Sequence, residues 1–181
     1  MAMKKLLAIA AVTAGGVLLM NRMKQRKGGV SSTRASLVVD VPVSAAYNQW
    51  TQFEQFPQFM SSVHEVKQLG DTRLHWRATI AGKEKEWDAE ITEQIPDRRI
   101  AWRSTSGVDN EGIVTFESAG EGKTRITLEM SYRPETFAEE VGDAFGAVKL
   151  QAKENLAKFK SLLESRGSET GAWRGTVPTH H

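Results

Sequence analysis

The feature that most restricts the fold of this chain is the alternation of apolar and polar residues between Val63 and Tyr132. In Arg73–Ala81, for example, every second residue is apolar. A period of two is typical of a strand with one buried face and one solvent-facing face. Six such segments occur, and turn residues separate them. The sequence therefore predicts an antiparallel meander with hairpin turns such as Gly70-Asp71, Ala81-Gly82-Lys83 and Pro96-Asp97-Arg98.

The buried face of such a sheet needs a cover, and the segment Pro134–Arg166 supplies one. Its apolar residues recur at spacings of three and four, which indicates one long amphipathic helix that ends near Gly167. Acidic residues lie early in the segment and lysines lie late, as the helix dipole favours. The apolar positions are Phe137, Val141, Phe145, Val148, Ala152, Leu156, Phe159 and Leu163.

The region before the meander combines a strand with two short helical segments. A strand over Leu37–Val41 is ended by Pro42, and Ser44 is expected to cap a helix over Ala45–Gln52. A second apolar segment with Phe53, Phe56, Phe59 and Met60 is interrupted by Pro57. The predicted order is β-α-α, six strands and a final helix, which is an α+β fold.

This order, the opening VDVPVSAAYNQW and the segment FPQFM resemble the START-like (SRPBCC) superfamily, which includes the polyketide cyclase/dehydrase proteins. The resemblance covers residues 35–167 and is greatest to bacterial cyclase/dehydrase proteins and the coenzyme-Q-binding type. It implies a helix-grip fold, in which a curved antiparallel sheet wraps around the long C-terminal helix and encloses an apolar cavity. The superfamily includes lipid and quinone carriers, cyclases, hydrolases and hormone receptors, so the fold alone does not define the function.

The inward-facing positions of the predicted sheet supply no acid, base or nucleophile, which favours binding over catalysis. Small residues among them, such as Ala78 and Ala89, favour an open cavity. His64 and Tyr47 are two further polar residues whose side chains could reach this cavity. We expect no catalytic, metal-binding or cofactor-binding residues. The residues expected to line a ligand cavity are Trp50, Phe53, Phe56, Phe59, Met60, Trp76, Trp87, Trp102, Phe116, Met130, Tyr132, Phe145, Val148 and Asn155.

The N-terminal residues 1–29 differ from the rest in charge and hydropathy. They hold six Lys/Arg and no acid around an uncharged run, Leu6–Met20, whereas the remaining residues hold 18 basic and 22 acidic side chains. A mildly acidic domain argues against nucleic acid as a partner. As a helix the run spans about 22 Å, which is short for a bilayer core of about 30 Å. An uncleaved anchor, a cleaved signal peptide and a helix packed on the domain remain open.

We expect the anchor reading to place the domain on the cytoplasmic side of a bacterial inner membrane, because more basic residues follow the run than precede it. The signal-peptide reading predicts export. Residues 30–34 are predicted to form a linker and residues 168–181 a mobile tail, although Trp173 of this tail could dock on a surface of the domain.

Three functions follow from these observations. The first is binding of a hydrophobic small molecule, such as a quinone, a lipid or a polyketide-like compound, by a membrane-tethered domain. The second is a cyclase or dehydratase that uses Tyr132 or Asn155, and the third is an envelope or stress-response domain that contacts a protein through its acidic face. The sequence does not determine the oligomeric state.

Overall fold

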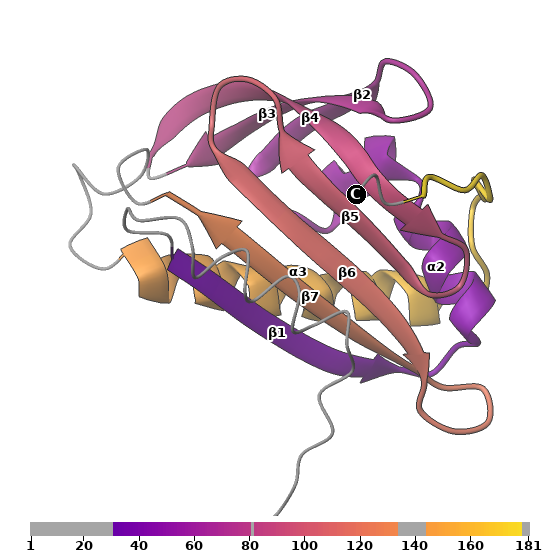
Figure 1. Ribbon diagram of the computed structural model, residues 1–181. Helices are drawn as coiled ribbons and strands as arrows, with labels where there is room; N and C mark the ends of the chain where they lie inside the picture. Colours follow the sequence, from indigo (N-terminus) through magenta and orange to yellow (C-terminus); the bar gives the residue numbers. More distant parts are fainter. Residues whose placement is uncertain (1–30, 81, 134–143, 179–181) are drawn as a thin grey trace, which may run out of the picture.

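A seven-stranded antiparallel sheet packs on one long helix in the computed structural model (Figure 1), which describes residues 31–80, 82–133 and 144–178. The strand order is β1-β7-β6-β5-β4-β3-β2, so every neighbouring pair except β1 and β7 is sequential. The elements are β1 (Ser31–Val39), α2 (Val43–Trp50), the 3-10 helix η1 (Phe53–Gln58), β2 (Val63–Gln68), β3 (Arg73–Ile80), β4 (Lys83–Ile95), β5 (Arg99–Ser104), β6 (Asn110–Ser118), β7 (Thr124–Tyr132) and α3 (Ala144–Arg166).

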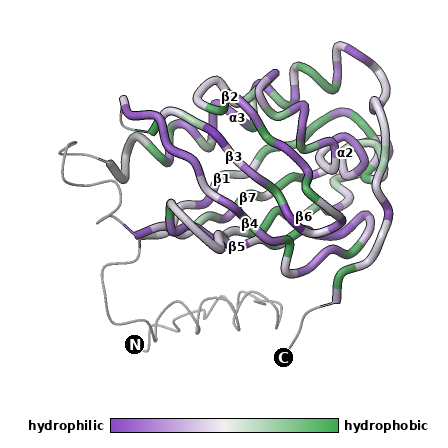
Figure 2. Tube along the Cα trace, turned by 90° about the horizontal axis from the view of Figure 1, so that it is seen from above, coloured by the Kyte–Doolittle hydropathy of each residue, from purple (hydrophilic) through white to green (hydrophobic). Residues whose placement is uncertain are grey.

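The helix α3 lies across one face of the sheet, and this face is the buried one (Figure 1). Leu156, Phe159 and Leu163 of α3 are almost fully buried there. Hydrophobic and hydrophilic positions alternate along the strands (Figure 2), as expected when only one face is covered. The predicted α+β helix-grip fold, with its meander and its closing helix, is confirmed.

An aromatic cluster holds α3 to the two short helices. The ring centroid of Trp50 lies 5.0 Å from that of Phe159, and Phe59 lies 5.1 Å from Phe159. The rings meet edge to face, the arrangement that the charge distribution of aromatic rings favours. This cluster fills the end of the space between sheet and helix that lies beside α2 and η1.

The first strand begins earlier than the sequence indicates. Residues 31–34, which were predicted as part of a linker, belong to β1, and Ser31 pairs with Tyr132 of β7. Ser32, Thr33 and Arg34 carry little strand signal, but pairing along the whole of β7 decides their conformation. The strand also ends at Val39 and not at Val41.

The first helix also departs from the prediction. It begins at Val43 after Pro42, and no side chain caps it, so Ser44 lies inside the first turn. The Pro42 carbonyl accepts a hydrogen bond from the Ala46 N–H at 3.1 Å. Pro42 has a φ of −60°, which the proline ring fixes and which suits the start of a helix. The helix therefore begins here without the predicted cap from Ser44.

The long helix is confirmed from Ala144 to Arg166, while its predicted first part, residues 134–143, lies outside the described residues. Gly167 ends it with a φ of +73°, and its N–H donates to the Leu163 carbonyl at 3.1 Å. Glycine adopts this left-handed conformation without the strain that a Cβ would cause.

The tail after α3 docks on the domain, which is the alternative to a mobile tail that the sequence left open for Trp173. Gln94 of β4 and Val177 exchange two backbone hydrogen bonds of 2.8 and 3.0 Å. The Trp173 N–H donates to Thr51 Oγ1 at 3.0 Å, and Arg174 forms an ion pair with Asp97 at 2.7 Å. Figure 1 shows this segment, in yellow, beside α2. The sequence does not indicate these contacts, because the segment is polar and has no periodicity. They are visible only in the folded chain.

The predicted anchor over residues 1–29 lies outside the described residues. Within the ranges that the structure describes, no helix is both long enough and apolar enough to cross a bilayer.

Candidate functional site

A cavity of about 260 Å³ lies between the sheet and α3. Its volume is close to the lower end of the range of about 300–1,000 Å³ that is common for small-molecule sites. It is lined by Trp50, Phe53, Phe56, Met60, Ser62, Val63, Leu74, Trp76, Ala78, Thr79, Ile80, Trp87, Ile91, Ile100, Trp102, Val108, Asn110, Leu128, Met130, Tyr132, Val148, Gln151, Ala152 and Asn155.

Tryptophan rings form much of the sheet side of the cavity. Trp76 and Trp87, which are paired across β3 and β4, stack with centroids 5.7 Å apart and planes 7° from parallel. The ring of Phe56 from η1 meets Trp76 edge to face at 5.6 Å. Flat aromatic surfaces of this kind favour a ligand with planar apolar groups.

The third tryptophan is positioned by a glycine and by a hydrogen bond. Trp102 of β5 pairs with Gly112 of β6, and a side chain at position 112 would collide with the indole ring. The Trp102 Nε1–H donates to Asn110 Oδ1 at 3.3 Å, and the Asn110 amide nitrogen donates to the Val108 carbonyl at 3.1 Å. The indole orientation at this wall is therefore defined on both sides.

Among the described residues that line the cavity there is no aspartate, glutamate, lysine, arginine or histidine. Its polar groups are hydroxyls, amides and indole N–H groups. One pair is internally satisfied, because Gln151 Nε2 donates to Ser62 Oγ. Two buried polar atoms on the lining residues, Trp76 Nε1 and Asn155 Oδ1, have no hydrogen-bond partner among the described residues.

The structure brings eleven of the predicted cavity residues together and leaves two out. Phe145 belongs to α3, but its side chain is outside what the structure describes. The residues found on the cavity wall are Trp50, Phe53, Phe56, Met60, Trp76, Trp87, Trp102, Met130, Tyr132, Val148 and Asn155. Whether they bind a ligand stays a prediction.

Phe59 and Phe116 belong to the hydrophobic core and do not line the cavity, which corrects the prediction. Phe59 packs between Phe56 and Phe159, at 5.1 Å from each. Phe116 packs against Tyr47 at 5.6 Å. Phe116 faces inward from β6 as the alternation indicates, and Phe59 follows η1. Both rings pack against Trp50 of α2.

Several polar lining residues were missed. Gln151 could have been found, since it lies three residues after Val148 and four before Asn155 on the same helical face. The stretch before Asn110 is polar and shows no alternation, yet β6 begins at this residue. Ser62 precedes the first strand of the predicted meander, and the alternation predicts that Thr79 faces outward, yet both residues line the cavity.

Tyr47 and His64 do not line the cavity. The Tyr47 hydroxyl accepts a hydrogen bond from Gln94 Nε2 at 2.9 Å, and burial raises the pKa of this tyrosine. His64 is exposed on β2 and its Nε2 lies 2.6 Å from Thr79 Oγ1. Neither side chain is placed to act on a molecule in the cavity.

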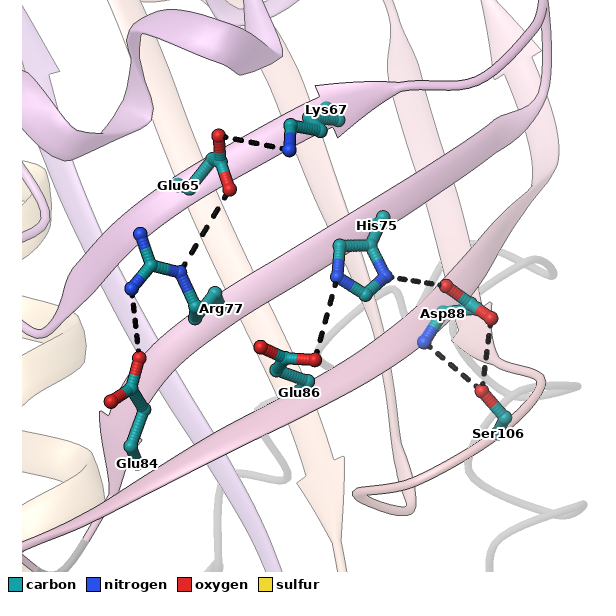
Figure 3. A network of polar contacts seen from close by, with 8 residues as sticks. All are labelled: Glu65, Lys67, His75, Arg77, Glu84, Glu86, Asp88 and Ser106. Carbon is teal, nitrogen blue, oxygen red and sulfur yellow. Dashed lines mark hydrogen bonds and ion pairs between the residues drawn. The ribbon is translucent and has the colours of Figure 1, made fainter.

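The outer face of the sheet carries a network of charged groups (Figure 3). His75 Nδ1 lies 2.8 Å from Asp88 Oδ1, and Ser106 Oγ donates to Asp88 Oδ2 at 3.2 Å. The hydrogen bond from His75 lowers the pKa of Asp88. A catalytic triad needs the serine on the imidazole, whereas Ser106 bonds the carboxylate. The arrangement cannot activate this serine.

Basic residues accompany the acids on this face, as Arg77 does for Glu84 at 2.8 Å and Arg103 for Glu90 at 3.3 Å. The hypothesis that an acidic face of the domain contacts another protein stays a prediction. Among the residues that the structure describes, no three or more His, Cys, Asp or Glu side chains are grouped as metal ligands would be.

Comparison with known families identifies the chain. The profile of the family described as polyketide cyclase/dehydrase and lipid transport matches residues 39–160, which include most of the sheet and the cavity. The chain belongs to this family. The resemblance inferred from the opening strand, the FPQFM segment and the element order is thereby confirmed.

One relative in the family is an uncharacterized 17.2 kDa protein from Streptomyces lincolnensis. It is 50% identical over 149 residues, which cover 82% of this chain and 99% of the relative. The similarity therefore includes nearly the whole of that protein.

Solved structures share the fold at low sequence identity. A START superfamily protein from Mycobacterium smegmatis is 16% identical with a TM-score of 0.60, over 76% of this chain and 97% of that one. The Zhui aromatase/cyclase from Streptomyces sp. R1128 is 12% identical with a TM-score of 0.64, over 80% of this chain and 100% of that one. At these identities the likeness concerns the fold alone.

Proposed function

We propose that this family member binds a hydrophobic small molecule, such as a quinone, a lipid or a polyketide-like compound, in the cavity between the sheet and α3. The observation that carries the proposal is the composition of the cavity wall, whose described residues are mostly aromatic and aliphatic and include no aspartate, glutamate, lysine, arginine or histidine. Such a wall stabilises an apolar molecule by removing its surface from water. It offers no group of the kind that usually transfers a proton at neutral pH.

The test compares two alanines of α3. Ala152 is buried and lines the cavity, whereas Ala157 is exposed on the same helix. Ala152→Phe fills the cavity with a ring, and Ala157→Phe adds the same ring to the solvent-facing side. Both variants alter helix propensity equally.

We expect native mass spectrometry of the full-length chain to detect a bound apolar molecule, or uptake of the neutral probe N-phenyl-1-naphthylamine, in the wild type and in Ala157→Phe. Ala152→Phe should lose most of this binding while it retains a cooperative thermal unfolding transition. If Ala152→Phe is not folded, Ala78→Leu supplies a smaller filling substitution on the sheet wall. Equal binding by the cavity and surface variants would refute the proposal.

The proposal includes a tether. We expect residues 1–29 to hold the domain at the cytoplasmic side of the bacterial inner membrane, near ligands that dissolve in lipid, which raises their effective concentration. Support comes from the apolar run and its basic flanks. Alkaline extraction of membranes should leave the full chain in the pellet, and removal of residues 1–29 should release it. Recovery of a shortened mature chain outside the cell would instead indicate a cleaved signal peptide.

A cyclase or dehydratase is the second candidate, because Tyr132 and Asn155 both line the cavity and could orient a carbonyl group. In this case a poly-β-ketone substrate should be turned over, and Tyr132→Phe should abolish turnover without loss of folding. An activity that Tyr132→Phe leaves intact would remove Tyr132 from the mechanism.

A further inference from the structure

Two polar atoms are buried at the cavity without a hydrogen-bond partner in the described part of the chain, namely Trp76 Nε1 and Asn155 Oδ1. Trp76 belongs to β3 and Asn155 to α3, so the two atoms come from opposite walls of the cavity. The indole nitrogen can only donate a hydrogen bond, and the amide oxygen can only accept one.

Buried polar groups without partners are rare, because the desolvation free energy of each is not offset by a hydrogen bond. Other polar groups of the same wall are satisfied within the protein. Trp102 Nε1 donates to Asn110, and Gln151 donates to Ser62. The contrast separates Trp76 and Asn155 from their neighbours as the two groups that a bound molecule can satisfy.

The charge of the wall restricts the ligand further. The described residues of the cavity wall include no cationic or anionic side chain, so a carboxylate or phosphate held among them would lack a counter-ion. Transfer of an unpaired charge into such a site is far more costly than transfer of a hydroxyl or carbonyl group. The cavity therefore disfavours the ionic head groups of fatty acids and phospholipids.

We infer that Trp76 and Asn155 are the specificity-determining residues of the cavity, and that its ligand is an uncharged ring compound with a hydrogen-bond acceptor for Trp76 Nε1 and a hydroxyl or N–H donor for Asn155 Oδ1. The inference rests on the proposed function and extends it to a ligand class. The stacked Trp76 and Trp87 rings supply the flat surface for the ring system. The ligand spans the cavity from sheet to helix.

The test uses five compounds that share one two-ring skeleton. Tetralin has neither polar group, 1-tetralone has the acceptor, and 5,6,7,8-tetrahydro-2-naphthol has a hydroxyl. The compound 6-hydroxy-1-tetralone has a carbonyl and a hydroxyl on different rings, and 6-methoxy-1-tetralone lacks the donor. Dodecanoate represents an anionic lipid chain. Calorimetric titration of the full-length chain at pH 6.5 keeps the phenols neutral.

We expect each correctly placed group to increase affinity about three- to tenfold, so that 6-hydroxy-1-tetralone binds most tightly and dodecanoate most weakly. Trp76→Phe keeps a ring but removes the N–H, and it should abolish the advantage of 1-tetralone over tetralin. Asn155→Leu keeps the approximate size and should abolish the advantage of 6-hydroxy-1-tetralone over its methyl ether.

Matched variants control for packing. Trp87→Phe removes an indole from the same stack, and Gln151→Leu removes an amide that Ser62 already satisfies. Both residues line the cavity, so these variants should change the affinity for all the ring compounds alike, while the ranking of the compounds stays that of the wild type. The ligand series on the wild type needs no substitution, so it tests the inference even if a variant fails to fold.

The outcomes separate the inference from the proposed function. If neither the tetralin compounds nor dodecanoate bind, the hydrophobic cavity as a binding site is refuted. If all five bind with equal affinity, or if the preferences survive in Trp76→Phe and Asn155→Leu, the two residues do not determine specificity while the binding function stands. Tighter binding of dodecanoate than of 6-hydroxy-1-tetralone would overturn the ligand class.

Discussion

Gly112 links the stability of the sheet to the shape of the cavity, and its substitution by alanine tests this link. Gly112 is buried on β6 between Trp102 of β5 and Met130 of β7, both of which line the cavity. A Cβ at this position would lie 2.6 Å from Trp102 Cη2 and 2.7 Å from the backbone oxygen of Glu129, and it would meet Trp102 Cζ2 as well. Ordinary van der Waals contact between such atoms begins at about 3.5 Å.

The backbone of β7 cannot yield without breaking its pairing with β6, so the indole must move toward the cavity. Overpacking of this kind costs about 1–3 kcal/mol of unfolding free energy. For a chain of this length, each kcal/mol lowers the melting temperature by about 2–4 °C. We therefore expect Gly112→Ala to unfold at a lower urea concentration with an unchanged m-value and to bind the apolar probe more weakly.

Gly70 provides the matched control, because a Cβ there would meet no atom within 4 Å. Gly70→Ala should leave stability within about 0.5 kcal/mol of the wild type. A double-mutant cycle completes the test: Trp102→Phe in the Gly112→Ala background should restore part of the lost stability, with a coupling energy of about 1 kcal/mol. Wild-type stability of Gly112→Ala, or additive effects of the two substitutions, would refute the steric argument.

Three further predictions concern the rest of the domain. Removal of residues 168–181 should lower the unfolding free energy by about 2–4 kcal/mol, because the backbone hydrogen bonds between Gln94 and Val177 and the hydrogen bond from Trp173 to Thr51 are lost. Urea unfolding measures this change, and an unchanged stability would indicate that the tail is mobile. Phe159→Ala should cost about 3–5 kcal/mol by the same assay, since the ring is fully buried against Trp50 and Phe59, and a loss below 1 kcal/mol would exclude it from the core. Because burial raises the pKa of Tyr47, the neutral form stabilises the fold below about pH 10, and this contribution is lost as the pH rises through the folded-state pKa. Thermal unfolding between pH 8 and 11 should therefore show a shallower alkaline decline in Tyr47→Phe than in the wild type, and equal slopes would contradict the assignment.

The cavity wall could be predicted in its sheet positions but not at its ends. Trp76, Trp87 and Trp102 follow from the period of two, because alternate residues of a strand must share a face. The same rule gave no means to separate Phe116 from them, although it also faces inward. Its exclusion from the cavity depends on where α2 packs, and Tyr47 of that helix fills the space next to it.

The polar groups of the site were less accessible to prediction. Asn155 was named because it shares a helical face with apolar residues, and Gln151 could have been named by the same argument. The hydrogen bond from Gln151 to Ser62 joins residues that are distant in the sequence. Local patterns carry no information on which of two amides finds a partner, so the contrast between Gln151 and Asn155 appears only in the folded chain.

The amino-acid sequence by itself determined the α+β class, the meander, the closing helix from its apolar spacing and the absence of charged groups from the inward face. These properties follow from periodicity, because burial of one strand face or one helix stripe is imposed locally. The tertiary structure alone decided that residues 31–34 extend β1, that the C-terminal segment docks on α2 and β4, and which inward residues enclose space instead of filling it. Pairing partners and packing distances join residues far apart in the chain, and they depend on the position of every element at once.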